Sequence, residues 1–159
     1  MGIEIERKFL LQSDDWRMAV ISESRLQQGF LSTDPQRTLR VRLADGEGTL
    51  TVKGLTQGAT RREYEYPIPA QDAAQLLDEL CLRPLIEKTR YRVPHAGLVW
   101  EIDVFFGENA GLVVAEVELG DEAQEVQLPP WVGAEVTGDP RYYNANLIRR
   151  PFSAWSNTN

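Results

Sequence analysis

Residues 2–11 read GIEIERKFLL, a stretch in which apolar and charged side chains alternate. Such a period of two is typical of a β-strand, so the isoleucines lie on one face and Glu4, Glu6 and Lys8 on the other. Two acids on one face repel each other unless positive charge lies between or opposite them. The rest of the chain must therefore supply the groups that meet this charged face.

The same alternation returns in most of the later strand candidates, and within each of them the charged positions keep one parity. These strands are predicted at 25–32, 38–43, 49–53, 62–68, 86–93, 99–105 and 114–119. Apolar spacing and capping residues predict helices over 13–24, over 71–82 and in the segment that begins at Asp139. About eight strands and three helices give an α+β pattern, which we interpret as one domain over residues 1–159.

The overall composition excludes some classes of protein. The net charge of −7 argues against broad binding to nucleic acid or to anionic membranes. No apolar run is long enough to span a membrane, and the single Cys81 cannot form an internal disulfide. We therefore expect a soluble, cytoplasmic protein, and the sequence leaves open whether it is a monomer or a homodimer.

The charged faces of these strands have two interpretations. The acids on them are Glu4, Glu6, Glu63, Glu65, Glu101, Asp103, Glu116 and Glu118, and the basic residues are Lys8, Arg40, Arg42, Lys53, Lys88, Arg90 and Arg92. One interpretation is an open sheet whose charged side is in water, where cross-strand ion pairs contribute little. The other is a closed barrel with a charged lumen, which needs close pairing or a highly charged ligand to offset desolvation. Composition alone does not decide between them.

The sequence motifs point to one family. The N-terminal EIERKFL resembles the ExExK signature of the CYTH, or triphosphate tunnel metalloenzyme, superfamily. It is followed in the expected order by LRVR, TVK, REYE, EKTRY, EIDVF and VAEVEL, and then by a RYYNANL segment. A single ExExK is weak evidence, but the ordered set covers almost the whole chain.

The resemblance implies a closed eight-stranded antiparallel β-barrel, with about three helices packed outside, that encloses a tunnel for a triphosphate and Mg²⁺ or Mn²⁺. Carried over by position, the residues expected to bind phosphate are Lys8, Arg40, Arg42, Lys53, Lys88 and Arg90. Those expected to bind metal are Glu4, Glu6, Glu63, Asp103, Glu116 and Glu118. Lys8, Glu4 and Glu6 are also expected to take part in catalysis.

The activity implied is metal-dependent hydrolysis of a triphosphate, with inorganic triphosphate as first choice, to diphosphate and phosphate. Fixed positive charge and bound metal supply what phosphoryl transfer needs, so no covalent intermediate is expected. The alternatives are a class IV adenylate cyclase, a thiamine or nucleoside triphosphatase, and a module that binds polyphosphate or a nucleotide without chemistry.

One residue departs from the family pattern. Several relatives carry Tyr where this chain has Phe30, and that hydroxyl is taken to work beside the N-terminal lysine. Without a phenol at this position, Lys8 is expected to act differently here. Arg61 and Arg62 precede the EYE strand, where they could reach a tunnel mouth, and the interpretation that we favour is a solvated hairpin end. His95 is interpreted as an exposed loop residue.

Overall fold

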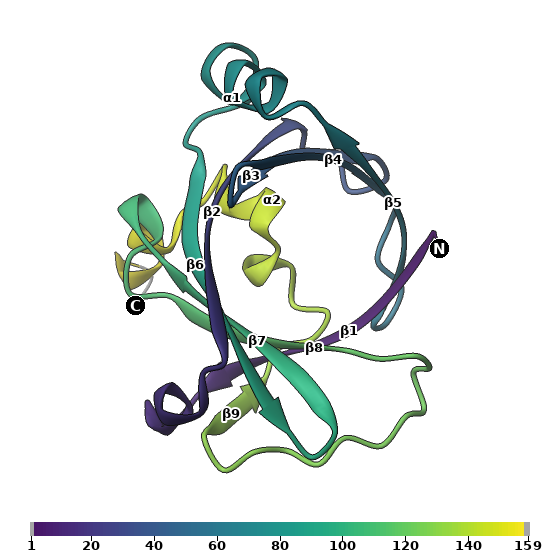
Figure 1. The fold of residues 1–159 in the computed structure, drawn as a ribbon, viewed down its shortest axis with the longest axis vertical. Coiled ribbons are helices and arrows are strands. Elements are labelled where there is room, and N and C mark those ends of the chain that lie inside the picture. The colour runs from purple at the N-terminus through teal and green to yellow at the C-terminus, as the bar shows by residue number, and fades with distance from the viewer. Residues whose placement is uncertain (1, 158–159) are drawn as a thin grey trace.

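The computed structural model describes residues 2–157 and contains a closed antiparallel β-barrel of eight strands (Figure 1). The strands are β1 (Ile3–Leu11), β2 (Ser22–Ser32), β3 (Thr38–Ala44), β4 (Glu47–Lys53), β5 (Thr60–Ile68), β6 (Ile86–His95), β7 (Leu98–Phe105) and β8 (Val113–Glu118). Around the ring their order is β5-β4-β3-β2-β6-β7-β8-β1, and pairing of β5 with β1 closes it. A ninth strand, β9 (Val132–Glu135), pairs with the C-terminal half of β1. The predicted closed barrel is confirmed.

β1 closes the barrel because its two halves pair with different strands. Residues 3–5 pair with β5, where Ile3 lies opposite Arg62, and residues 6–10 pair with β8, where Glu6 lies opposite Glu118. The N-terminal strand is therefore the seam of the ring, and its charged face looks into the bore.

Two of the hairpins turn within two residues. The β3–β4 turn is Asp45-Gly46 and the β6–β7 turn is Ala96-Gly97, and all four residues have positive φ. Turns of this kind match the right-handed twist of the strands that they join. They fix the register of β3 against β4 and of β6 against β7, and so set which basic residues face inward.

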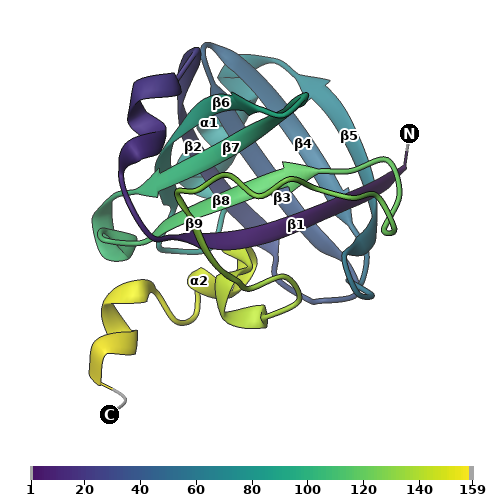
Figure 2. The ribbon, with the colours of Figure 1, turned by 90° about the horizontal axis from the view of Figure 1, so that it is seen from below.

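The helices lie outside the barrel or across one end of it. α1 (Ala70–Glu79) packs Ala73 and Leu77 against Val41 on the outer face of the sheet (Figure 1). α2 (Asn144–Leu147) is a single turn in the C-terminal segment, which crosses one end of the barrel in Figure 2. Short 3₁₀ helices occupy Asp15–Ala19, Gly107–Asn109, Pro140–Tyr142 and Phe152–Asn157. No described helix has the length and apolar character needed to cross a membrane.

The predicted number of helices was wrong, because two of the three predicted helices form only in part. Segment 13–24 holds only a short 3₁₀ helix, and β2 already begins at Ser22, where pairing with β6 outweighs the local helical pattern. The segment from Asp139 is divided into short turns, and Pro151 separates the last two because it lacks a backbone N–H. Only the prediction at 71–82 yields a longer helix, α1.

The outward faces of β1, β7 and β8 carry the largest apolar cluster. The ring centroid of Trp100 lies 5.4 Å from that of Phe9 and 5.7 Å from that of Trp131. Trp16, on the first 3₁₀ helix, and Val132, on β9, cover this cluster from outside. Apolar residues thus pack on the exterior of the strands, as their alternation predicts.

At one end of the barrel the inward positions are apolar rather than charged. This apolar plug consists of Leu10, Phe30, Ile86, Phe105 and Val114 from the strands and Tyr142, Leu147 and Ile148 from the C-terminal segment. Each strand residue of the plug lies two positions from a polar or charged inward residue, and therefore on the same face. A small hydrophobic core closes part of this end of the charged bore.

Candidate active site

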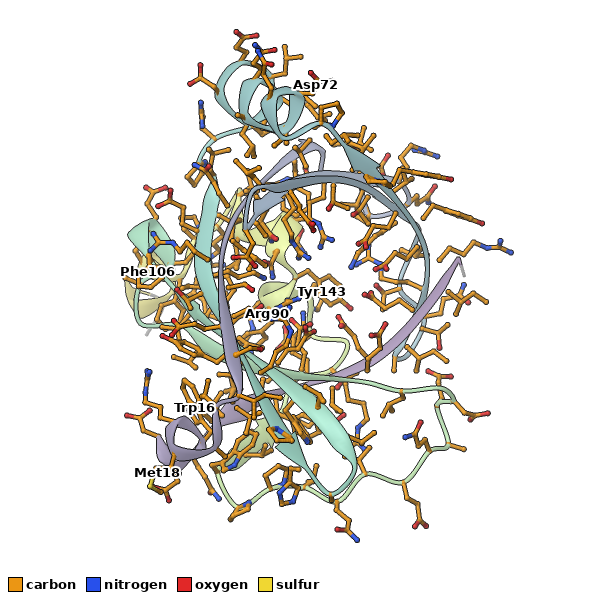
Figure 3. All side chains as sticks on the ribbon, in the orientation of Figure 1. Trp16, Met18, Asp72, Arg90, Phe106 and Tyr143 are labelled. Carbon is orange, nitrogen blue, oxygen red and sulfur yellow. The ribbon has the colours of Figure 1, made fainter. Side chains whose placement is uncertain are left out.

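The bore of the barrel contains a cavity of about 680 Å³ that is lined by charged side chains of both signs. The acids are Glu4, Glu6, Glu63, Glu65, Glu101, Glu116 and Glu118, and the basic residues are Lys8, Arg40, Arg42, Lys53, Arg61, Lys88, Arg90 and Arg92. Figure 3 shows Arg90 within the ring of strands, and Trp16, Met18 and Asp72 outside it. The charged faces meet in an enclosed space, which excludes the open-sheet interpretation.

β1 and β8 bring four carboxylates onto one wall of the cavity. Antiparallel pairing sets Glu6 opposite Glu118 and Lys8 opposite Glu116, and Glu4 is the next inward residue of β1. Burial, and then the charges of Glu116 and Glu4, raise the pKa of Glu6 well above its ordinary value. Among the described residues, Glu6 has no cation within ion-pair distance. Such a carboxyl group is stabilised in its charged form by any cation that enters.

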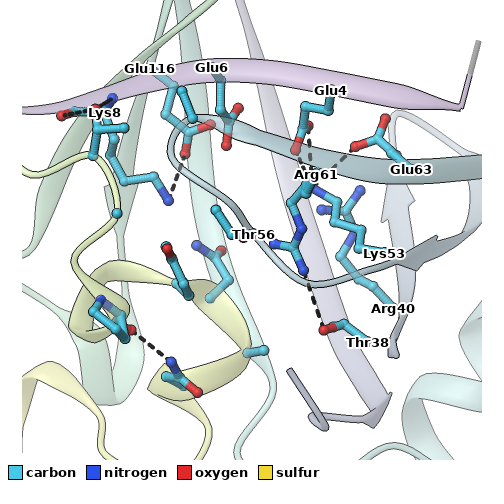
Figure 4. Close-up of a pocket in the computed structure, with 18 of the residues that line it drawn as sticks. Glu4, Glu6, Lys8, Thr38, Arg40, Lys53, Thr56, Arg61, Glu63 and Glu116 are labelled. Atoms are coloured by element: carbon cyan, nitrogen blue, oxygen red, sulfur yellow. Dashed lines mark hydrogen bonds and ion pairs between the residues drawn. The ribbon is translucent and has the colours of Figure 1, made fainter. Parts of the chain in front are cut away.

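Two lysines form ion pairs with acids of this wall and with the neighbouring Glu63. The ammonium of Lys53 lies 3.1 Å from Glu4 and 3.2 Å from Glu63 (Figure 4). Lys8 lies 3.8 Å from Glu116. Although burial raises the pKa of Glu116, the charge of Lys8 brings it down to about 2. Glu116 is therefore ionised at neutral pH.

A buried acid on β7 holds two cations of β6 in place. Lys88 Nζ lies 2.7 Å from one oxygen of Asp103, and Arg90 donates to both oxygens at 2.8 and 3.0 Å. Burial alone would raise the pKa of Asp103, but the charges of Arg90 and Lys88 hold it far below its ordinary range. Asp103 is fully buried and does not line the cavity. Its role as a metal ligand stays a prediction, and in this geometry it is the counter-ion of the two cations.

Two guanidinium groups of β3 face the same cavity. Arg40 donates to Thr51 at 3.2 Å and lies 3.7 Å from Glu65, but its buried Nε has no partner among the described residues. Arg42 donates from Nε to Gln28 at 3.0 Å. Burial and the neighbouring guanidinium groups lower the pKa of both arginines. An anion in the cavity would relieve this repulsion.

Arg61 also lines the cavity, so its interpretation as part of a solvated hairpin end was wrong. Its Nε donates to the carbonyl of Gly54 at 3.2 Å and its Nη2 to Thr38 at 3.4 Å. Figure 4 shows the guanidinium reaching into the cavity toward Thr38. The available signal was its parity with Glu63 on the same strand, which places both side chains on the inward face.

The C-terminal segment fixes Lys8. Thr137 Oγ1 accepts a hydrogen bond from the backbone N–H of Lys8 at 2.9 Å, and the carbonyl of Tyr142 accepts one from its Nζ at 3.4 Å. The Nζ also lies 5.5 Å from the centroid of the Tyr143 ring. The segment that crosses the end of the barrel therefore helps to position a lysine of the site.

The acidic wall has the donor set that hard divalent cations prefer, since all of its ligands are oxygens. As the side chains stand, no group of three or more acidic, histidine or cysteine residues within 2–157 is arranged closely enough to hold an ion. The wall nevertheless fits a cation chemically, because Glu6 and Glu118 have no ion pair within the described part of the chain. Burial, together with repulsion from neighbouring acids, raises the pKa of both. A cation would bind between these two and their neighbours Glu4 and Glu116.

Comparison with known proteins identifies the family. The profile of the CYTH domain matches residues 2–152. The chain belongs to the CYTH domain family. A relative from Acetivibrio thermocellus, named inorganic triphosphatase, is 46% identical to this CYTH protein over 152 residues, which are 96% of this chain and 97% of the relative.

Two further comparisons agree with this membership. An inorganic triphosphatase from Nitrosomonas europaea is 39% identical over 150 residues, covering 91% of this CYTH protein and 95% of the relative. A solved structure of an inorganic triphosphatase is 37% identical and has a TM-score of 0.62, covering 91% of this chain and 97% of that chain. The similarity therefore extends over almost the whole length of each protein.

Most of the residues predicted for the site are brought together in this CYTH domain. All of them except Asp103 line the cavity, while their individual roles stay predictions. Phe30 lines it as well, with its ring in the apolar plug. Sequence reasoning favoured a solvated position for Arg61 and missed Asn144 as a lining residue, and only Arg61 follows a strand alternation that indicates an inward position.

Proposed function

We propose that this chain is a metal-dependent hydrolase that cleaves inorganic triphosphate to diphosphate and phosphate inside the barrel. The observation that carries the proposal is the enclosed cavity, in which a wall of carboxylates faces lysines and arginines from the other strands. Two relatives that align with nearly the whole chain are named inorganic triphosphatase, which supports this choice of substrate.

In this proposal the basic residues bind and orient the phosphate oxygens. Arg40 and Arg42 face this space from β3, and Lys88 faces it from β6. Cations fixed in this way neutralise charge on the non-bridging oxygens without reorganising during the reaction. Lys8 lies between the acidic wall and the C-terminal segment, where it can contact both the anion and the wall.

Glu4, Glu6, Glu116 and Glu118 are the residues that we propose to hold Mg²⁺ or Mn²⁺, with Glu63 at the edge of the group. A bound divalent cation supplies Lewis acidity toward the phosphate oxygens and toward a water nucleophile. Within the described part of the chain, no serine, cysteine or histidine lines the cavity. We therefore propose direct attack by water, without a covalent enzyme intermediate.

The substrate is proposed to be a free small molecule. The net charge of −7 repels nucleic acid and anionic membranes from the outer surface, whereas eight of the seventeen lysines and arginines line the bore. The single cysteine is an unpaired thiol, which is consistent with a reducing cytoplasm.

Phosphate release from tripolyphosphate, ATP and thiamine triphosphate, each with and without Mg²⁺ or Mn²⁺, tests the proposed function. We expect the fastest release from tripolyphosphate and none without metal. Formation of cyclic AMP from ATP would identify an adenylate cyclase instead, and tight binding without turnover would identify a binding module. Hydrolysis that needs no metal would contradict the mechanism.

Phe30 cannot take part in proton transfer at this site. Its side chain is 3% exposed and belongs to the apolar plug, with no hydroxyl to donate or accept a proton. We propose that Lys8 and water carry out the proton transfers of the reaction in this protein.

The affinity for tripolyphosphate is expected to fall above about pH 8. Burial lowers the pKa of Lys88 to about 8, and the attraction of Asp103 offsets this effect only in part. Lys88 is charged below this pH and neutral above it, so affinity falls by up to about tenfold per pH unit. Calorimetric titration of the metal-free protein would measure the change after correction for the ionisation of the ligand. Lys88→Arg, which stays charged, should remove the decline, and a wild-type affinity that stays constant through pH 9 would contradict the expectation.

A further inference from the structure

Asn144, the first residue of α2, places its side-chain amide against the wall of the bore. Its Oδ1 accepts a hydrogen bond from Gln28 Nε2 at 2.6 Å and another from Lys88 Nζ at 2.8 Å. Gln28 and Lys88 are fully buried, whereas Asn144 lines the cavity. The C-terminal segment is therefore attached to the part of the wall that carries inward-facing cations.

The chemistry of the neighbours fixes the orientation of this amide. Arg42 can only donate, so the atom of Gln28 that lies 3.0 Å from its Nε is the carbonyl oxygen. The other arm of Gln28 is then its NH₂ group, a donor, and the ammonium of Lys88 is also only a donor. Asn144 must turn its oxygen toward both of them and its Nδ2 away from them.

The Nδ2 group of Asn144 has no hydrogen-bond partner among the described residues. Its N–H bonds meet no acceptor among residues 2–157, since both hydrogen bonds of this side chain go to Oδ1. It also keeps solvent access, because the inaccessible side-chain nitrogens without a partner in the described part of the chain belong to Trp16, Arg40 and Trp100, and Asn144 itself lines the cavity. The donor is therefore available to whatever occupies the cavity, next to the positive charge of Lys88.

We propose that Asn144 is a substrate-binding residue, whose Nδ2 donates a hydrogen bond to a phosphate oxygen while its Oδ1 orients the ammonium of Lys88. This inference deepens the proposed function and rests on it. A neutral amide suits the position because its oxygen accepts hydrogen bonds from the protein while its NH₂ group donates one to the phosphate. A carboxylate could accept from Lys88, but it could not donate and would repel the anion.

Two substitutions separate the donor from the acceptor. Asn144→Ala removes both, and we expect it to raise the KM for tripolyphosphate about tenfold. Asn144→Asp keeps an acceptor for Gln28 and Lys88 but replaces the donor with negative charge, and we expect a rise of about a hundredfold. Gln75→Glu, an amide-to-acid change at an exposed position of α1, is the matched control and should leave KM unchanged.

The order of the two variants tests the inference. If Asn144 served only to fasten the C-terminal segment, Asn144→Asp would match wild type and only Asn144→Ala would be impaired, and this result would overturn the proposal. Both comparisons start from an active wild type. A wild-type protein that does not hydrolyse tripolyphosphate would refute the proposed function instead, so the two failures are distinguishable.

A second measurement needs no variant and no turnover. In the ¹⁵N-labelled, metal-free wild type, binding of tripolyphosphate should move a side-chain amide proton of Asn144 downfield, because it enters a hydrogen bond to a charged oxygen. The buried amide of Asn109, which does not line the cavity, is the internal reference. An Asn144 amide that does not respond at saturating tripolyphosphate would overturn the inference.

Discussion

Replacing Asp103 with asparagine is expected to lower the free energy of unfolding by about 3 to 5 kcal/mol at neutral pH, the cost of leaving buried charge unpaired. The carboxylate is fully buried and binds Arg90 at 2.8 and 3.0 Å and Lys88 at 2.7 Å. Asparagine preserves the shape but removes the counter-charge of both cations. Urea denaturation would measure the loss, and Asp78→Asn, at an exposed position of α1, is the matched control, with an expected change under about 0.5 kcal/mol.

The pH dependence of this loss has a definite sign. Because the folded protein holds the pKa of Asp103 below its unfolded value of about 4, the stabilisation is present above that pH and declines as the pH falls below it. The stabilities of wild type and Asp103→Asn should therefore converge in acid. Tripolyphosphate should restore part of the variant's stability, since it brings negative charge to the same cations. A variant as stable as wild type at neutral pH would show that Asp103 is not their counter-ion.

Glu6→Gln is expected to have opposite effects on activity and stability. In the presence of Mg²⁺ or Mn²⁺ it should lower kcat/KM for tripolyphosphate at least about a hundredfold, because a proposed metal ligand loses its charge. Without metal it should raise the melting temperature. Burial and the charges of Glu116 and Glu4 raise the pKa of Glu6, so its ionised form destabilises the fold at neutral pH and the neutral amide removes that cost.

Thermal unfolding with and without Mn²⁺ measures the second effect. Metal should raise the melting temperature of wild type more than that of Glu6→Gln, because wild type gains relief of repulsion as well as binding. Glu125→Gln, at an exposed position outside the cavity, is the control and should behave as wild type. Full activity in Glu6→Gln, or a lower melting temperature of the metal-free variant, would contradict the role proposed for Glu6.

Alternation along each strand was enough to predict the strands and the side chains that line the bore, because side-chain direction in a strand follows a local period of two. Glu4, Glu6 and Lys8 are inward for this reason alone. Closure of the ring could not be predicted in the same way. It depends on residues 3–5 pairing with residues 60–62, and nothing local in either segment specifies that partner, so the family resemblance supplied this part.

Strand alternation does not show how far along the bore an inward residue lies, or whether other side chains separate it from the cavity. Asp103 is an inward position of β7, as Glu116 is of β8, yet Arg90 and Lys88 lie between Asp103 and the cavity. Phe105 continues that parity at the end of β7 and belongs to a hydrophobic core. Parity therefore cannot separate a ligand from a counter-ion or from a packing residue.

The C-terminal segment shows a different limit. Asn144 follows no alternating pattern, and its side chain is placed by contacts with Gln28 on β2 and Lys88 on β6. Those partners are more than fifty residues away in the chain, so only the folded structure brings them together.

The separation of charged and apolar faces also protects the alignment of strands during folding. If β6 slid by one residue against β7, Lys88 and Arg90 would turn outward, and Val93 would leave its place beside Trp100 and turn inward. Such a slip would place the unpaired charges of both residues in the apolar outer layer and would leave Asp103 without its counter-ions. A barrel with the wrong register is therefore less stable because of unfavourable contacts on both its inner and its outer face. The charged residues proposed to bind the anion thus also favour the correct strand register during folding.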